Sequence, residues 1–169
     1  MGPGLQARVP TLREMVRGDT VGMDRSTAPI QVVFDTADPA ALSTFWASAL
    51  APRGYAVPPP PGNFPDWPAF LTAQGVPEER FNDASAIEAD GQPRIFFQLV
   101  PEAKSGKNRV HIDLLAGGGP SVPLDEQRER VAAEVARLQA LGATRVEERA
   151  DLGVYWVVMQ DPEGNEFCV

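Results

Sequence analysis

Residues 31–46 read QVVFDTADPAALSTFW, and this stretch decides the fold because it joins a strand to an amphipathic helix. The segment 30–36 is rich in β-branched and aromatic residues, which predicts a buried strand. Asp38 followed by Pro39 is typical of a helix N-cap with proline at the first helical position. Apolar side chains then recur at steps of three and four over 42–50, so they lie on one helical face.

The same order of elements occurs a second time along the chain. After the first helix, strands are expected over 53–57, 84–89 and 94–100, with an irregular insertion over 58–83. A second unit follows, with a strand over 109–116, a helix over 124–141 and strands over 144–149, 154–159 and 165–169. The pattern therefore predicts an α+β fold of two βαβββ repeats, covering approximately residues 29–101 and 108–169.

Polar side chains share one face of these strands, because successive residues of a strand point to opposite sides of its sheet. The residues expected on the face away from the helices are Gln31, Val33, Asp35, His111, Asp113, Leu115, Glu166 and Cys168. A curved mixed sheet with its helices on the outer side would place this face inside a cup. The cup is therefore the expected place of a functional site.

Composition excludes several classes of function. The 169 residues carry a net charge of -8, which repels nucleic acids and anionic membranes. No run approaches the ~20 apolar residues needed to span a bilayer. Residues 1–28 have no clean periodicity and are predicted to form a flexible arm before one domain over 29–169. They also lack the apolar core of a secretory signal, so a cytoplasmic location is expected.

The chain has one histidine, His111, and one cysteine, Cys168. A single cysteine excludes an internal disulfide and any cysteine-rich zinc site. A single histidine excludes every metal site that needs two histidines from one chain. Whatever chemistry the protein performs, it has one imidazole per subunit.

Three stretches of the sequence resemble the glyoxalase-like domain of the vicinal oxygen chelate superfamily, which also includes bleomycin-resistance proteins and dioxygenases. They are QVVFDTADPAALSTFW at 31–46, FFQLVPEAKSGKNRVHIDL at 96–114 and DPEGNEFCV at 161–169. The resemblance implies a cup of two repeats that binds a small molecule. It also implies a homodimer, in which the site can combine residues of two subunits.

Members with known chemistry hold a divalent metal with four inward-facing residues. Carried over, the resemblance puts these positions at Gln31, Gln98, His111 and the end of the last strand. Cys168 stands there where many members have a glutamate, and Glu166 is the nearest acid. A hard divalent ion prefers carboxylate and imidazole ligands. A suitable set of His111, Glu166 and Gln31 therefore forms only if Glu166 takes the place of the missing glutamate at position 168. The implied cofactor is one Zn, Ni, Fe or Mn ion, or none.

Each candidate catalytic residue has a second interpretation. His111 is a metal ligand or acid–base group, or else a histidine bonded to a neighbouring strand. Glu166 is a ligand or general base, or else a carboxylate on a solvated strand end. Asp113 orients His111 or acts as a base, or else pairs with Lys107 or Arg109. The residues expected to bind substrate are Gln31, Gln98, Phe96, Trp67, Trp156 and Cys168.

Two functions fit these residues. In the first, a lyase or isomerase uses a metal to bind two neighbouring substrate oxygens, and Glu166 or Asp113 moves the proton. In the second, a metal-free protein binds a drug or metabolite, and its acidic surface suits a cationic ligand. The single histidine counts against the ring-cleaving dioxygenases, which the resemblance associates with two histidines and a carboxylate.

Overall fold

A computed structural model describes residues 30–169, so the arm expected over 1–28 lies outside the described residues. The helices are α2 (Pro39–Leu50), α3 (Trp67–Ala73) and α4 (Leu124–Ala140), with short 3-10 turns at Ala51–Arg53 and Glu78–Arg80. The strands are β1 (Gln31–Thr36), β2 (Ala84–Ile87), β3 (Arg94–Leu99), β4 (Thr144–Asp151), β5 (Val154–Gln160) and β6 (Glu166–Cys168). Over this range no helix is both long and apolar enough to cross a membrane.

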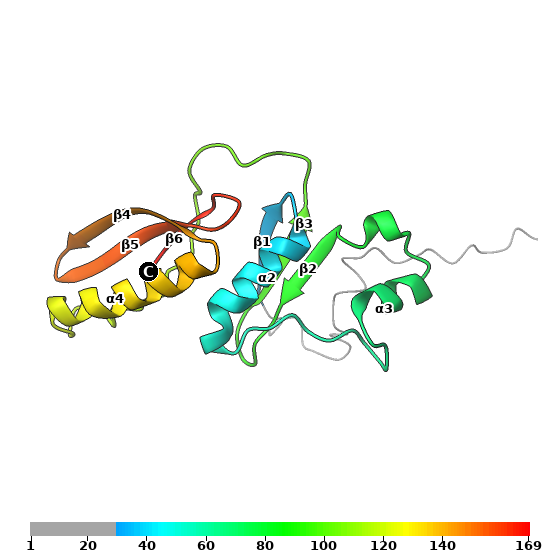
Figure 1. The fold of residues 1–169 in the computed structure, drawn as a ribbon, viewed down its shortest axis with the longest axis horizontal. Coiled ribbons are helices and arrows are strands. Elements are labelled where there is room, and N and C mark those ends of the chain that lie inside the picture. The colour runs from blue at the N-terminus through cyan, green and yellow to red at the C-terminus, as the bar shows by residue number, and fades with distance from the viewer. Residues whose placement is uncertain (1–29) are drawn as a thin grey trace, which may run out of the picture.

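The first repeat is a three-stranded sheet in the order β1-β3-β2, with α2 on one face (Figure 1). β1 and β3 run parallel, and β2 pairs with β3 in antiparallel register. Asp38 caps α2, because its Oδ1 accepts a hydrogen bond from the backbone N–H of Ala41 at 3.1 Å. The Asp38-Pro39 signal in the sequence therefore marks the true start of the helix.

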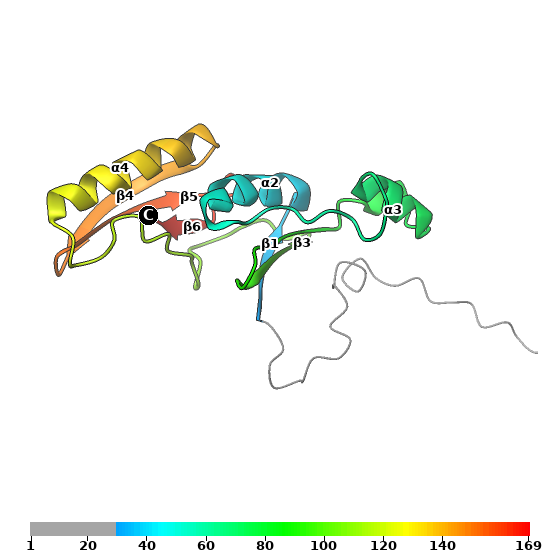
Figure 2. The same cartoon turned by 90° about the horizontal axis from the view of Figure 1, so that it is seen from below.

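The second repeat has the same topology. Its sheet has the order β4-β5-β6, and the segment 112–114 lies along the free edge of β6. The backbone N–H of Leu114 donates to the carbonyl of Cys168, and the N–H of Cys168 donates to the carbonyl of Ile112, both at 2.9 Å. Helices α2 and α4 lie along the same side of the strands (Figure 2). The α+β fold of two βαβββ repeats is therefore confirmed.

Two of the expected strands are shorter than the sequence indicates. The strand expected over 53–57 is reduced to one bridge, between Ala56 and Glu88, because four prolines follow at 58–61 and cannot continue a ladder. The strand expected over 109–116 is likewise one bridge, between Asp113 and Cys168. It ends where Leu115 takes a left-handed conformation with φ of 48°, just before a glycine-rich turn.

The insertion over 58–83 covers the face of the first sheet that lies opposite α2. Phe70 and Leu71 of α3 pack with Phe96 of β3 and Ala86 of β2 in a second hydrophobic cluster. The neighbouring residue Phe97 points the other way, into the main core. Part of the face expected to line the cup is therefore filled by the protein's own side chains.

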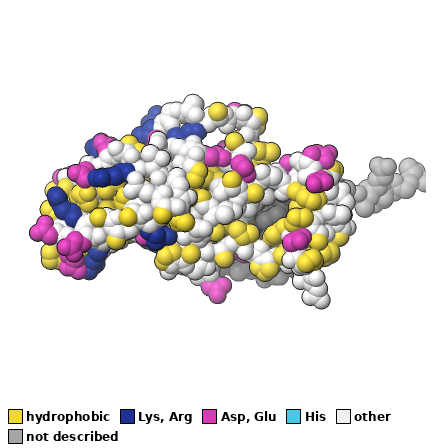
Figure 3. Space-filling view, in the orientation of Figure 1, with side chains coloured by type: hydrophobic (Ala, Val, Ile, Leu, Met, Phe, Trp, Pro, Cys, Tyr) yellow, Lys and Arg dark blue, Asp and Glu magenta, His cyan; other side chains and the backbone are white. Residues whose placement is uncertain are grey.

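The main core joins the two repeats through aromatic side chains. Trp46 of α2 contacts Phe34 of β1 at 5.6 Å and Phe167 of β6 at 5.2 Å between ring centroids. Trp46 and Phe167 are each 1% exposed. Charged side chains of both signs lie on the surface of the α4 and β4 end (Figure 3).

Candidate functional site

The Asp161–Asn165 turn, which enters β6, fixes the second repeat to the first. The buried Asp161 carboxylate accepts hydrogen bonds from the indole N–H of Trp46 at 3.1 Å and from the backbone N–H groups of Glu163 and Asn165. Gly164 has a φ of 82°, a conformation that favours glycine. The turn is therefore also a connection between the two repeats.

Helix α2 is held at both ends by side chains of the second repeat. At its start, the Glu163 carboxylate accepts hydrogen bonds from Thr36 Oγ1 at 2.6 Å and from the backbone N–H groups of Ala37 and Asp38. At its end, the Arg137 guanidinium donates to the backbone carbonyls of Ser48 and Ala49. Both charges match the helix dipole, negative at the N-terminus and positive at the C-terminus. We call this arrangement of Glu163 and Arg137 the α2 clamp.

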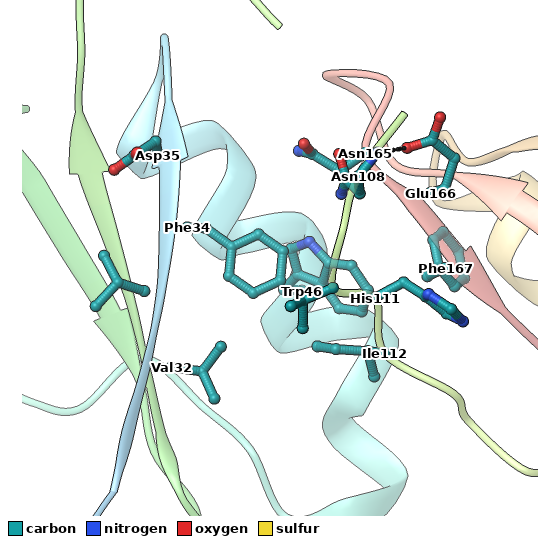
Figure 4. Close-up of a pocket in the computed structure, with 12 residues that line it drawn as sticks. Val32, Phe34, Asp35, Trp46, Asn108, His111, Ile112, Asn165, Glu166 and Phe167 are labelled. Atoms are coloured by element: carbon teal, nitrogen blue, oxygen red, sulfur yellow. Dashed lines mark hydrogen bonds between the residues drawn. The ribbon is translucent and has the colours of Figure 1, made fainter. Parts of the chain in front are cut away.

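A cleft of about 220 Å³, which we call the inter-repeat cleft, lies between β1 and the segment 108–112 (Figure 4). Apolar side chains, including Phe34, Trp46 and Phe167, line it. Its polar lining residues are Asp35, Asn108, His111, Asn165 and Glu166. The cleft lies between the two repeats, and its walls are mainly apolar.

The Glu166 carboxylate is already engaged by groups of the connecting loop. It accepts a hydrogen bond from the backbone N–H of Asn108 at 3.0 Å and pairs with Lys104 Nζ at 3.1 Å. The hydrogen bond from Asn108, helped by Lys104, lowers the pKa of Glu166 against the opposing effect of burial. Glu166 thus anchors the loop, and its contact with Lys104 fits its second interpretation, a carboxylate at a strand end.

His111, Asp113 and Cys168 converge on the other side of the segment 108–113, and we call them the polar cluster. Their ligand atoms all lie within 4.8 Å of one another, and His111 Nε2 is 3.2 Å from Asp113 Oδ1. Val32 and Phe34 lie on the opposite side of the cleft from His111, and Figure 4 shows that the imidazole of His111 points away from them. Burial, with the nearby Asp113 carboxylate, raises the pKa of the Cys168 thiol to about 11.

The polar cluster lines a second cavity of about 320 Å³, which we call the second-sheet hollow. Trp156 of β5 contributes an aromatic wall, and Leu115 and Gly117–Gly119 contribute to its lining. Pockets of this size with apolar walls and few polar groups are typical of small-molecule sites. The hollow therefore combines an imidazole, a carboxylate and a thiol with an apolar wall.

The remaining residues expected at the site lie elsewhere. Gln31 Oε1 accepts a hydrogen bond from Arg94 Nη1 at 3.0 Å, so its amide oxygen is engaged by a guanidinium. Gln98 lies on β3 opposite Asp35 of β1 and is not among the residues around the cleft or the hollow. Phe96 and Trp67 belong to the cluster beneath the insertion, and Trp67 Nε1 donates to the carbonyl of Pro58 at 2.8 Å.

The sequence reasoning missed the roles of Glu163 and Asn108. Glu163 lies within the DPEGN stretch at 161–165, and its four acceptor contacts reach residues about 125 positions away in the chain, which no local sequence pattern indicates. Asn108 contributes through its backbone N–H, for which the residue type carries no signal.

The donor set of the polar cluster fits a zinc-type ion better than a hard cation. Zinc takes imidazole, thiolate and carboxylate ligands, and its tetrahedral geometry places donor atoms about 3.3–3.8 Å apart. The donors of the cluster approach this spacing, and His111 and Asp113 are exposed enough to rotate. Three protein ligands leave one coordination position open, as in catalytic zinc sites.

Comparison with known families matches residues 31–169 to the model described as a glyoxalase-like domain. None of the curated proteins compared with the chain matches it.

Among solved structures, the chain is similar to a glyoxalase/bleomycin resistance protein/dioxygenase family enzyme from Burkholderia phytofirmans PsJN. The TM-score is 0.51 at 18% identity, covering 82% of this chain and 93% of that one. It is also similar to the fosfomycin resistance protein FosX from Listeria monocytogenes, solved with Mn(II) and a dihydroxypropylphosphonic acid. The TM-score there is 0.53 at 11% identity, covering 84% of this chain and 87% of that one. At these identities the likeness concerns the fold.

Proposed function

Because the chain belongs to the glyoxalase-like domain family, we propose that it binds a small molecule in the second-sheet hollow, above the polar cluster. One observation carries this proposal: an imidazole, a carboxylate and a thiol lie within 4.8 Å of one another at a cavity of about 320 Å³. Trp156 offers a flat apolar surface against which a ligand ring or alkyl group can pack.

In the enzymatic form of the proposal, His111, Asp113 and Cys168 hold one zinc-type ion. Such an ion would polarise a ligand oxygen and stabilise negative charge that develops on it. Asp113, with a side chain that is 53% exposed, would hold the ion through one carboxylate oxygen, and its other oxygen can accept a hydrogen bond from the bound molecule. His111 supplies a neutral nitrogen, and Cys168 must lose its proton to bind a metal. This chemistry belongs to the lyase and isomerase class.

Metal analysis of the purified protein tests this form. We expect about one zinc per subunit after zinc is supplied, and a thiolate-to-cobalt charge-transfer band when cobalt replaces zinc. His111→Ala should lower the metal content, and Cys168→Ser should abolish the band. Glu166→Gln is the matched control, because the Glu166 carboxylate is engaged by Asn108 and Lys104 and should leave metal binding unchanged. Loss of metal in the control, with full retention in His111→Ala, would contradict the proposed ligand set.

A second form of the proposal is a metal-free binding protein, and the protonated state of Cys168 favours it. With a pKa near 11, the thiol stays neutral at physiological pH unless a metal displaces its proton. A thermal-shift screen with cationic antibiotics and α-keto thiohemiacetals, with and without a chelator, separates the two forms. A ligand at 100 times its dissociation constant adds about 2.7 kcal/mol to stability. Stabilisation that survives chelation supports the metal-free form, and stabilisation that chelation abolishes supports the enzyme.

We further propose that the protein is a cytoplasmic homodimer. Apolar side chains of β1 and the following repeat are exposed, among them Val33, Val110 and Leu115. Pairing of these surfaces between two copies would remove them from water. Light scattering at known protein concentration tests the dimer, with Val110→Lys as the variant expected to yield monomer.

A further inference from the structure

Among the described residues, the outer edge of β2 has backbone groups without partners next to a cavity. Next to the antiparallel pair of β2 and β3, the backbone N–H of Leu99 donates to the carbonyl of Asp83. Every second residue of an antiparallel strand bonds to the same neighbour, so the backbone groups of Ser85 and Ile87 also point towards β3. The N–H and C=O groups of Ala84 and Ala86 therefore point away from β3. Among residues 30–169 no group forms a hydrogen bond with them.

This edge of β2 has no neighbouring strand among the described residues, because the segment after Ala56 turns away from it. Ala56 exchanges two backbone hydrogen bonds with Glu88, at 3.0 and 2.9 Å, as the first step of a further antiparallel strand. In that register the next partners of Ala86 and Ala84 would be Pro58 and Pro60. Proline has no N–H to donate, and the run of four prolines leaves the edge.

A cavity of about 360 Å³, which we call the edge pocket, lies at this place. Trp67, Leu71 and Phe81 give it apolar walls, and Ser85 Oγ lies on the α2 side, hydrogen bonded to Ser43 Oγ at 2.7 Å. Ala86 itself is only 2% exposed, so its backbone groups are costly to leave without a partner.

We propose that the edge pocket is a second binding site, distinct from the second-sheet hollow, for a small apolar molecule with two secondary amides joined through one carbon, as in a blocked amino acid. The N–H of the first amide donates to the carbonyl of Ala86 or Ala84, and the carbonyl of the second amide accepts from the N–H of the same alanine. This is the exchange that Ala56 and Glu88 already make one step along the edge. The open edge spans only two residues, about 7 Å, which fits a ligand the size of one blocked amino acid. The aromatic and aliphatic walls select an apolar side chain.

The test uses N-acetyl-leucine N-methylamide as the probe and nuclear magnetic resonance as the readout. On titration at millimolar concentration we expect saturable shifts of the amide signals of Ala84 and Ala86. An analogue with oxygen in place of the leucine N–H should bind about fivefold more weakly, because it loses one hydrogen bond. Equal affinity for the two probes would overturn the proposal, as would shifts confined to residues of the second-sheet hollow.

A variant that fills the edge pocket gives an independent test. Thr44 is exposed on α2 and lines the pocket, so Thr44→Trp should weaken probe binding at least tenfold. Ala41→Trp is the matched control, because Ala41 is exposed on the same helix but is not a lining residue. Unchanged binding in Thr44→Trp would refute the site. The comparison of the two probes on the unaltered protein stands even if the variant fails to fold.

Discussion

Removing the charge of Glu163 should loosen the two repeats from each other. Its carboxylate accepts hydrogen bonds from a hydroxyl and two backbone N–H groups at 2.6–3.1 Å, at the start of α2. Glu163→Gln keeps the shape and one acceptor oxygen but loses the charge. Hydrogen bonds to a charged group contribute about 1.5–3 kcal/mol, and an anion at a helix N-terminus about 0.3–1 kcal/mol. Because Glu163 is only half-buried, we expect a loss of about 2 kcal/mol.

For a chain of this length that loss corresponds to a fall of about 4–8 °C in Tm. Thermal and urea unfolding measure it, and Glu129→Gln is the matched control, an exposed glutamate on α4. Arg137→Met should cost a similar amount at the other end of the helix. The two ends lie about 18 Å apart, so the effects should add. A Tm within the error of the unaltered protein for Glu163→Gln would refute the role of the α2 clamp.

Three further predictions concern single side chains. Alkylation of Cys168 by iodoacetamide should be slow at pH 9.0 and become faster towards pH 11. Asp113→Asn should speed the alkylation at pH 9.0, because it lowers the thiol pKa, and an unchanged rate would contradict the role of the Asp113 charge. Glu166→Gln should cost about 1 kcal/mol in urea unfolding at neutral pH, and the cost should vanish as pH falls through the lowered carboxyl pKa of the folded state. Gln127→Leu should cost about 3 kcal/mol, because the buried Gln127 amide bonds to three backbone groups that would lose their partner; a loss below 1 kcal/mol would show that water replaces it.

The fold could be predicted from the sequence because local signals agreed with the repeat. The Asp38-Pro39 start of α2, the apolar face of that helix and the order of strands all fall where the structure has them. The bridge at Ala56 and the bridge at Asp113 fell short of the expected strands for reasons of local backbone, prolines in one case and a left-handed leucine in the other.

The candidate site was harder to predict, because it depends on which neighbour each polar side chain meets. Period-two alternation put Glu166 and Cys168 on one face, yet only Cys168 joins His111. Glu166 is taken by Lys104 and a backbone N–H of the connecting loop, and no local pattern encodes where a loop folds. The sequence also could not show that side chains of the insertion would fill part of the face expected to line the cup.

That filling makes the two halves of a duplicated fold unequal. The face of the first sheet under α3 is now a matter of packing, so substitutions at Phe96 or Phe70 should register as lost protein abundance. The corresponding face of the second repeat stays open, and changes at Trp156 should leave abundance intact while they alter what is bound. In a saturation mutagenesis library scored for protein abundance and for ligand binding, substitutions before about residue 108 should mainly lower abundance, and substitutions after it should mainly alter binding. After the duplication, the first repeat would then mainly maintain the stability of the fold, and the second would be free to acquire ligand specificity.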